Sequence, residues 1–256
     1  MPPAARRALI AGLGLLGGSI GIALRRRGWR VAYLDPHVAL ASARGRAAAD
    51  ERVEMISETD LVILATPVDA ALDLLRTMPP IRTTSVCSVL QPLRALADGR
   101  SLPFVAGHPL AGSHERGLAA ARADLFEGKR WFVDAEDVVV HDLIRDCGAI
   151  PDRIDPAEHD RVMALTSHLP QVLSTALAAL AAGEEDVERF AGGGLRTFLR
   201  LAGSDASIWA PVLAANRDNI RAHFGRLVEI ARAIIEEEPG EAFERAQRLW
   251  AELSAE

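Results

Sequence analysis

The chain has 256 residues with 29 Lys or Arg and 35 Asp or Glu, which gives a formal net charge of −6, and 49% of its residues are hydrophobic. This composition is typical of a soluble globular protein of one large or two modest domains, and it excludes a disordered chain. The negative charge disfavours nucleic acid as a partner, since phosphates are bound by clustered Lys and Arg, and no apolar stretch resembles a normal membrane span.

Short apolar runs alternate with helical patterns through the first 150 residues. Strand, helix and strand in repeated succession predict an α/β fold, a doubly wound Rossmann-type parallel sheet. The predicted strands, mostly bounded by Gly, Pro or Asp, are Ala8–Ala11, Val31–Leu34, Leu61–Ala65, Ser85–Val89, Phe104–Ala106 and Trp131–Val133. The predicted helices are Leu15–Arg27, Val38–Ala49, Val68–Met78, Pro92–Leu96 and Asp137–Cys147.

After about Arg153 the pattern becomes helical. Asp155, Pro156 and Glu158 form an N-cap, a first-turn proline and a capping-box glutamate. The long helical segments that follow present more apolar residues than a lone bundle of this size needs. We therefore predict two domains, residues 1–153 and an all-helical domain of residues 154–256, and a homodimer formed through the second. The long helical segments are Pro156–Ala182, Ile208–Glu238 and Gly240–Leu253.

A glycine-rich segment joins the first predicted strand to the first predicted helix. In its GxGxxG pattern Gly12 permits a tight turn, Gly14 lets a pyrophosphate approach the backbone, and Gly17 lets the helix pack closely on the strand. The phosphates would meet the positive end of the helix, which begins with Leu15 and Leu16. The pattern predicts a dinucleotide site.

Asp35 ends the next predicted strand, where a carboxylate accepts hydrogen bonds from the ribose hydroxyls of NAD and would repel the 2′-phosphate of NADP.

Two other interpretations of the glycine-rich region are weaker. Ser19 completes the GxSxG pattern of hydrolases but lies inside the predicted helix, not on a turn directly after a strand. Arg6 and Arg7 before an apolar stretch imitate a secretory signal, but that stretch holds five glycines.

The two cysteines give no sign of a metal site or a disulfide. They are far apart and form no CxxC pair, Cys87 and Cys147 being the only two in the sequence, which fits a reducing cytoplasm.

His108 follows a predicted strand at the carboxyl edge of the sheet, where doubly wound folds bind ligands, and Pro109 restrains it to an extended backbone. Its position favours a catalytic role, with a structural role as the alternative. Four histidines are interpreted as solvent-facing or structural: His37, His141, His159 and His223.

Four motifs in order resemble the prephenate/arogenate (cyclohexadienyl) dehydrogenases of tyrosine biosynthesis: Gly12–Ser19, Gly107–Ser113, Ser167–Pro170 and the segment from Gly192 through Arg200 to Trp209. The resemblance covers nearly the whole chain. It implies an NAD-binding domain, a helical dimerisation domain and an active site in the cleft between them. The implied reaction is NAD-dependent oxidative decarboxylation of prephenate to 4-hydroxyphenylpyruvate, or of arogenate to tyrosine.

The resemblance also implies roles for individual residues. His108, as neutral imidazole, accepts the hydrogen bond of the ring hydroxyl and assists its deprotonation, and Ser88 lies near the nicotinamide and that hydroxyl. Arg200 binds a substrate carboxylate through its planar guanidinium. Ser88 could instead cap a strand end, and Arg200 could be a surface residue. The turn beneath the cofactor is Thr66, Pro67 and Val68, and the further substrate contacts are Ser113, His114, His168 and Gln171.

The chain departs from the family pattern around the substrate side chain. Gln171 stands where a second histidine is frequent, His114 where many relatives have glutamate, and Thr197 and Leu90 replace an acidic residue and a lysine. The preference between the keto acid prephenate and the amino acid arogenate therefore stays open. No mutase domain is expected before Met1 and no regulatory domain after Glu256.

Two other functions are weighed against this one. The first is another two-domain nicotinamide dehydrogenase of the β-hydroxyacid or imine-reducing type, which would normally have a lysine base on the first helix of its second domain. The helix predicted from Pro156 to Pro170 contains no lysine. The second is a nucleotide-sensing dimer, which would bind NAD without turnover.

Overall fold

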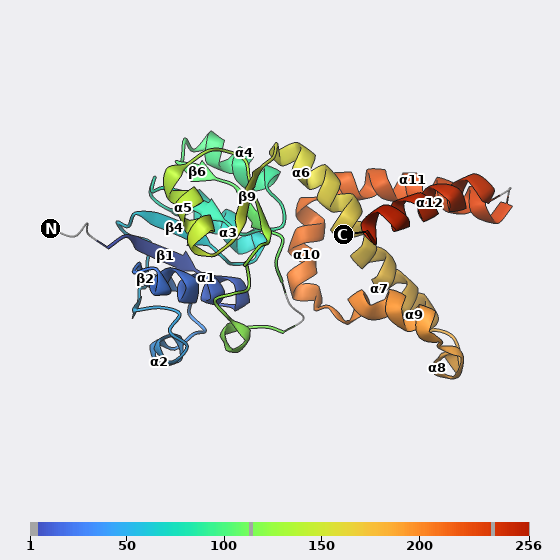
Figure 1. The fold of residues 1–256 in the computed structure, drawn as a ribbon, viewed down its shortest axis with the longest axis horizontal. Coiled ribbons are helices and arrows are strands. Elements are labelled where there is room, and N and C mark those ends of the chain that lie inside the picture. The colour runs from blue at the N-terminus through green and yellow to red at the C-terminus, as the bar shows by residue number, and fades with distance from the viewer. Residues whose placement is uncertain (1–4, 113–114, 237–238, 256) are drawn as a thin grey trace. The chain divides into compact units, whose positions relative to one another are not determined.

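The computed structural model describes residues 5–112, 115–236 and 239–255 (Figure 1). Its larger sheet has the strand order β3-β2-β1-β4-β5-β6, and all five neighbouring pairs are parallel. The order reverses between β1 and β4, which confirms the predicted doubly wound fold. The strands are β1 Arg7–Ala11, β2 Arg30–Leu34, β3 Glu51–Arg52, β4 Leu61–Leu64, β5 Thr83–Ser85 and β6 Phe104–Val105.

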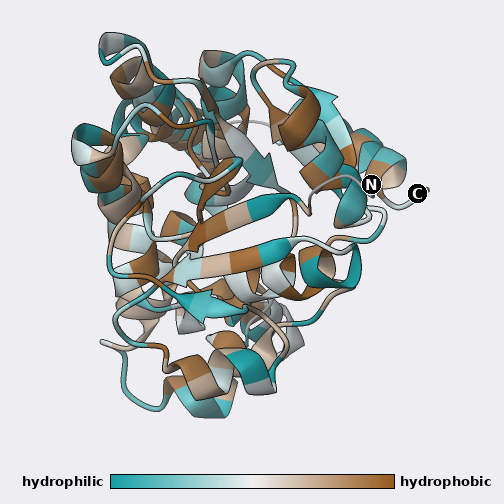
Figure 2. Cartoon of the chain, turned by 90° about the vertical axis from the view of Figure 1, so that its left-hand side faces the viewer, coloured by the Kyte–Doolittle hydropathy of each residue, from teal (hydrophilic) through white to brown (hydrophobic). Residues whose placement is uncertain are grey.

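Helices cover both faces of this sheet because its strands are apolar on both sides. Ile10 and Ile63 belong to the core that includes residues of α1 and α5, whereas Leu9 and Val62 belong to the core of α3 and α4. The central strands are accordingly largely brown in Figure 2, as expected for buried parallel strands. The helices of this half are α1 Leu15–Arg26, α2 Leu40–Gly45, α3 Val68–Thr77, α4 Gln91–Gly99 and α5 Val138–Asp146, with a short 3₁₀ turn, η1, at Leu118–Ala120.

A second sheet of three strands has the order β7-β8-β9. Strand β7 (Gly107–Pro109) runs antiparallel to β8 (Arg130–Val133), which runs parallel to β9 (Ile150–Arg153). The chain leaves the large sheet at Ala106, whose N–H donates to the Asp134 carboxylate at 2.9 Å. The strand predicted at Trp131–Val133 is therefore present, but in this separate sheet.

Some predicted boundaries are wrong. The strand predicted at Ser85–Val89 ends at Ser85, and Val86, Cys87 and Val89 are buried in the following loop, so their apolar run reflects burial in the core and not extended pairing. Strands β3, β7 and β9 have no counterpart among the predicted strands. They are short, and two of them contain a proline, which weakens the sequence signal of a strand.

Every element after Arg153 in the described residues is helical, as predicted. The helix predicted at Pro156–Ala182 is interrupted by a π-helical turn, η2 (Ala164–His168). Pro170 lacks the N–H that would continue regular bonding, which accounts for the widened turn before it. The other elements are α6 Pro156–Met163, α7 Leu169–Ala181, α8 Val187–Phe190, α9 Gly193–Phe198, η3 Leu199–Gly203, α10 Ala206–Ala215, α11 Arg217–Glu236 and α12 Gly240–Leu253.

The chain divides into two compact units. The first comprises Met1–Met163 with Gly203–Ala215, and the second comprises Ala164–Ala202 with Asn216–Glu256. Helices α6 and α10 thus belong to the unit of the sheets, where α6 lies against α4 and α10 against α3. The domain boundary predicted at 153/154 concerns functional domains and stays a prediction.

Candidate functional site

The turn between β1 and α1 is built on three glycines with different surroundings. Gly12 has φ +89°, and a Cβ there would lie 2.6 Å from the Ala65 carbonyl oxygen. A Cβ on Gly17 would lie 2.0 Å from the Gly12 carbonyl oxygen. A Cβ on Gly14 would have no heavy atom within 4 Å, and no side chain caps the first amides of α1, which start at Leu15 and continue at Leu16. Among the described residues the turn therefore offers uncapped backbone N–H groups at a helix N-terminus, which is suited to binding an anion.

Asp35 lies directly after β2 and contacts this turn. One carboxylate oxygen accepts the N–H of Leu13 at 2.8 Å, and the other accepts the N–H of His37 at 2.8 Å. These two bonds hold the carboxylate beside the glycine turn and leave further lone pairs for a ligand.

The turn after β4 also adjoins the glycine turn, because Ala65 contacts Gly12. Thr66 has a buried hydroxyl with no hydrogen-bond partner in the described part of the chain, and Pro67 and Val68 lead into α3. An unpaired buried hydroxyl, an open glycine and uncapped helix amides together fit a bound dinucleotide.

His108 lies on β7 and is 9% exposed. Its Nδ1 is 2.9 Å from Nε2 of His159, with the two rings nearly perpendicular at 85°. Nδ1 of His159 is 2.8 Å from a carboxylate oxygen of Asp160. That carboxylate accepts the N–H of Leu90 at 2.8 Å and the N–H of Gln91 at 3.0 Å, at the start of α4. The imidazole is thus backed by a chain of hydrogen bonds that reaches a helix N-terminus.

The sequence does not predict this arrangement. It indicates a solvent-facing or structural His159. The residue is 1% exposed, which excludes the first alternative only, and it contacts His108, which lies 51 residues earlier in the chain. A His-Asp pair inside a helical segment gives no local sign of which strand it packs against.

Ser88 lies in the loop between β5 and α4, three residues beyond the end of β5, so it is not part of the strand predicted at Ser85–Val89. It is half-buried. Its hydroxyl makes no hydrogen bond among the residues that the structure describes. Ser85 connects this segment to β7, the strand of His108. Its hydroxyl donates a hydrogen bond to the Gly107 carbonyl and accepts one from the Gly107 N–H, both at 3.2 Å.

The second compact unit carries three of the predicted substrate residues. His168 is buried in η2, with Nδ1 3.1 Å from the side-chain amide nitrogen of Asn216. Gln171 is buried in α7, and its amide nitrogen donates to the Leu201 carbonyl at 2.9 Å. Arg200, which precedes Leu201, is exposed on η3. The fold therefore brings the segments of Gln171 and Arg200 together, whereas Ser113 and His114 lie outside the described residues.

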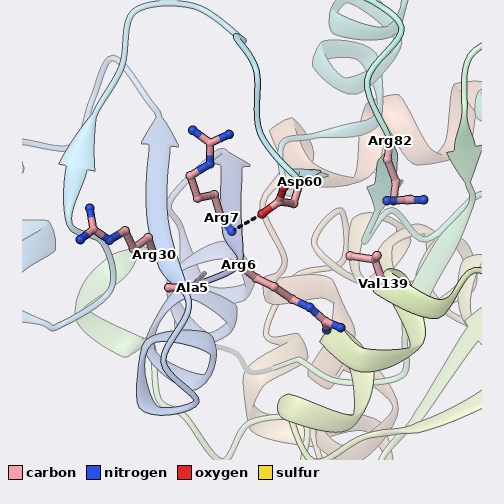
Figure 3. A pocket seen from close by; sticks show the side chains of 7 residues that line it. All are labelled: Ala5, Arg6, Arg7, Arg30, Asp60, Arg82 and Val139. Atoms are coloured by element: carbon pink, nitrogen blue, oxygen red, sulfur yellow. Dashed lines mark hydrogen bonds between the residues drawn. The ribbon is translucent and has the colours of Figure 1, made fainter. Parts of the chain in front are cut away.

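A surface hollow of about 760 Å³ lies elsewhere, at the amino ends of β1, β2, β4 and β5 (Figure 3). Two of its arginines are neutralised by ion pairs, Arg6 with Asp142 at 2.6 Å and Arg82 with Asp137 at 2.9 Å. Because the glycine turn and Asp35 follow the carboxyl ends of their strands, this hollow is separate from the nucleotide site. Its lining residues are Ala5, Arg6, Arg7, Arg30, Asp60, Arg82 and Val139.

Other side chains with reactive groups are enclosed. Ser19 is fully buried, and its hydroxyl accepts the N–H of Arg122 at 3.0 Å, which is incompatible with an exposed hydrolase nucleophile. Burial raises the pKa of Cys87 to about 12 and also raises the pKa of Cys147. The described residues include no cluster of three potential metal ligands and no helix that is long and apolar enough to span a membrane.

Comparison with known proteins places both halves of the chain in one family. Residues 20–136 match the family "Prephenate dehydrogenase, nucleotide-binding domain", and residues 155–248 match "Prephenate dehydrogenase, dimerization domain". The prephenate dehydrogenase of Bacillus subtilis is 33% identical over 91% of this chain and 71% of its own length. The prephenate dehydrogenase of Lactococcus lactis is 29% identical over 82% of this chain and 65% of its own.

A solved structure agrees with these matches. The prephenate dehydrogenase of A. aeolicus, crystallised with hydroxyphenyl propionate and NAD+, has a TM-score of 0.86 at 25% identity, covering 99% of this chain and 100% of that one. The nucleotide-binding turn, the helical second half and these similarities lead to one conclusion: the chain belongs to the prephenate dehydrogenase family.

Proposed function

We propose that this protein catalyses the NAD-dependent oxidative decarboxylation of prephenate, arogenate or both, forming 4-hydroxyphenylpyruvate or tyrosine, and so serves tyrosine biosynthesis. One observation carries the proposal: a single compact unit holds both a glycine turn suited to a dinucleotide and a buried imidazole, His108, whose Nδ1 is hydrogen-bonded to His159. Family membership supplies the substrate class, since relatives are named prephenate dehydrogenase and cyclohexadienyl dehydrogenase.

The cofactor would lie with its pyrophosphate at Gly12, Gly14 and Gly17 and its adenosine ribose at Asp35. The fixed position of the Asp35 carboxylate beside the turn supports NAD over NADP, because a 2′-phosphate would meet a like charge. When bound, NAD accepts the hydride that leaves the ring carbon bearing the hydroxyl. The turn of Thr66, Pro67 and Val68 would pass beneath it, with the free hydroxyl of Thr66 available to the cofactor.

His108 performs the proton transfer in this proposal. Neutral imidazole accepts the hydrogen bond of the ring hydroxyl and takes its proton as the C–H bond breaks, which leaves a ring ketone. Loss of the ring carboxylate as CO₂ then makes the ring aromatic and places an electron pair on the same oxygen, to which His108 returns the proton. Ser88 would hold this oxygen in line with the imidazole.

Five residues are proposed to bind the substrate side chain, and three of them, His168, Gln171 and Arg200, belong to the second compact unit. Arg200 would pair with a carboxylate, which suits an exposed guanidinium. Gln171 has a buried amide oxygen with no hydrogen-bond partner within the described chain, and its amide nitrogen donates to the Leu201 carbonyl. The remaining contacts proposed are Ser113, His114 and His168.

We further propose functional domains at residues 1–153 and 154–256 and a homodimer built through the second. Support for the dimer comes from the family description of residues 155–248 as a dimerization domain. Large apolar side chains are also exposed on α11 and α12, namely Phe224, Val228, Ile230, Ile235, Phe243, Leu249, Trp250 and Leu253. The two buried free thiols are compatible with a cytoplasmic protein.

A single assay tests the function. NADH absorbance is followed with prephenate, arogenate and a panel of hydroxy acids, with NAD and NADP in parallel. Turnover of a cyclohexadienol with NAD supports the proposal, and His108→Asn should lower kcat by about two orders of magnitude or more while NAD still binds. Turnover of hydroxy acids alone would indicate a β-hydroxyacid dehydrogenase, which would lack its usual base here because the chain has a single lysine, Lys129. NAD binding without any turnover would indicate a sensor.

A further inference from the structure

Two buried ionisable residues are linked to His108 by hydrogen bonds and have no role in the proposed reaction. His159 and Asp160 are neighbours on α6, and each is 1% exposed. Burying such groups is costly unless they are paired, and both are engaged in the hydrogen-bond chain that ends at His108. We propose that His159 and Asp160 are positioning residues that fix the tautomer and the orientation of the His108 imidazole. This inference rests on the proposed role of His108 as proton acceptor.

The hydrogen-bond chain begins at Asp160. Its carboxylate lies at the amino end of α4 and accepts two backbone N–H groups, those of Leu90 and Gln91. Both carboxylate oxygens accept backbone amides, which can only donate, and a helix N-terminus favours a negative charge, so Asp160 acts as a hydrogen-bond acceptor toward His159 as well. The hydrogen bond of 2.8 Å to His159 therefore requires the proton to lie on Nδ1 of His159.

That requirement determines the next imidazole. A neutral imidazole has one N–H, so Nε2 of His159 carries a lone pair. His108 Nδ1 lies 2.9 Å from this atom and must donate its proton to it. The other ring nitrogen of His108, Nε2, is then unprotonated. It is the atom that can accept the substrate hydroxyl and afterwards its proton. The cation formed on His108 keeps its bond to His159, whose opposite side is bonded to a carboxylate.

The orientation of the rings is also fixed by packing. Strand β8 places Phe132 opposite His108, and the Phe132 ring lies 5.6 Å from that of His159 at an angle of 72°. Among the described contacts, the ionisable groups facing His108 come from α6, and β8 presents an uncharged ring. Because His159 is held between Asp160, Phe132 and His108, rotation of His108 would cost a hydrogen bond inside a closed environment.

Asp160→Ala tests the tautomer directly. It removes the only acceptor described beside Nδ1 of His159 and leaves the backbone N–H donors at the start of α4 near that atom, so the protons on both imidazoles would move to the other nitrogen. His108 would then carry its proton on Nε2 and could not accept the hydroxyl. We expect kcat to fall by about 10²- to 10⁴-fold, with the Kd for NAD unchanged.

A graded pair of variants at the middle residue complements this test. His159→Gln places an amide oxygen where Nε2 accepts the bond from His108 and should retain kcat within about tenfold, whereas His159→Leu should lose as much as Asp160→Ala. The acidic limb of kcat/KM against pH should move to lower pH in His159→Leu, because the His108 cation has lost its acceptor. Ile144→Val, a core change on α5, lowers stability without moving that limb and serves as the control.

A second readout needs no substrate. Two-bond ¹H–¹⁵N spectra of histidine-labelled protein identify the protonated ring nitrogen, and His108→Asn assigns the signal. Protonated Nδ1 in the wild type that shifts to Nε2 in Asp160→Ala supports the inference. An unchanged tautomer in that variant, or equal kcat losses in His159→Gln and His159→Leu, overturns it. If Asp160→Ala does not fold, the comparison of His159→Gln with His159→Leu decides. If the wild type turns over no cyclohexadienol, the proposed function fails while the spectra still judge the hydrogen-bond chain.

Discussion

Two glycines of the nucleotide turn should respond to the same substitution in opposite ways. In Gly17→Ala the new Cβ would lie 2.0 Å from the Gly12 carbonyl oxygen and 3.0 Å from Ile10 Cγ2. Neither the backbone at Gly12 nor strand β1, which carries Ile10, can move by more than an ångström unless α1 shifts as well. We expect a loss of about 3 kcal/mol in the free energy of unfolding. For a chain of this size that corresponds to a fall in Tm of about 6–12 °C.

Gly14→Ala meets no heavy atom within 4 Å, and its φ of −81° is open to alanine. The free energy of unfolding should therefore change by less than about 1 kcal/mol. The added methyl occupies the space where a pyrophosphate would contact the backbone, and overpacking of about 1–3 kcal/mol raises the Kd for NAD roughly 5- to 150-fold. Thermal unfolding and titration of NAD by calorimetry measure both quantities.

A third glycine gives the control. Gly99 at the end of α4 is exposed and also has open space around its Cβ position, so Gly99→Ala should change neither the Tm appreciably nor the affinity for NAD. Wild-type affinity in Gly14→Ala would refute the assignment of the pyrophosphate to this turn. A wild-type Tm in Gly17→Ala would refute the packing argument.

Three further outcomes are expected. Asp35→Asn removes the charge that would repel a 2′-phosphate, so the ratio of Kd values for NADP and NAD should fall about tenfold or more, as equilibrium titrations would show. Gln171→His replaces an unpaired acceptor oxygen by a group that can carry positive charge, so the kcat/KM ratio of prephenate to arogenate should rise about tenfold, and an unchanged ratio would place Gln171 outside the substrate site. Because burial raises the pKa of Cys87 to about 12 and also raises that of Cys147, neither thiol should react with a disulfide reagent at pH 8 in the native protein, whereas both should react in urea; rapid labelling of the folded enzyme would contradict this.

The parts of the fold that the sequence predicts are those encoded by contiguous residues. The strand at Leu61–Leu64 is a run of apolar residues, all buried, and the glycine pattern predicts both the turn and the start of α1. The helix predicted at Gly240–Leu253 has the bounds observed for α12. In each case the local pattern and the tertiary surroundings favour the same conformation.

Failures of prediction occur where distant segments decide the outcome. Val86 and Val89 resemble strand residues but are buried in a loop, because β4 pairs with Thr83–Ser85. Strand β7 has three residues, including a glycine and a proline, and exists because β8 pairs with it from more than twenty residues away. No window of sequence contains that information.

The same distinction applies to the two halves of the proposed chemistry. A dinucleotide turn is local, so it can be recognised in many dehydrogenases and by itself says little about the reaction. The hydrogen-bond chain proposed to fix the proton on His108 consists of residues of β7, α6 and the start of α4, which meet only in the folded protein. A chain could keep every glycine of the turn and lose the reaction by changing one buried carboxylate. The residues that define this chemistry are therefore those whose partners lie farthest away in the sequence, and Asp160, which is linked to His108 through His159, provides the most sensitive test of it.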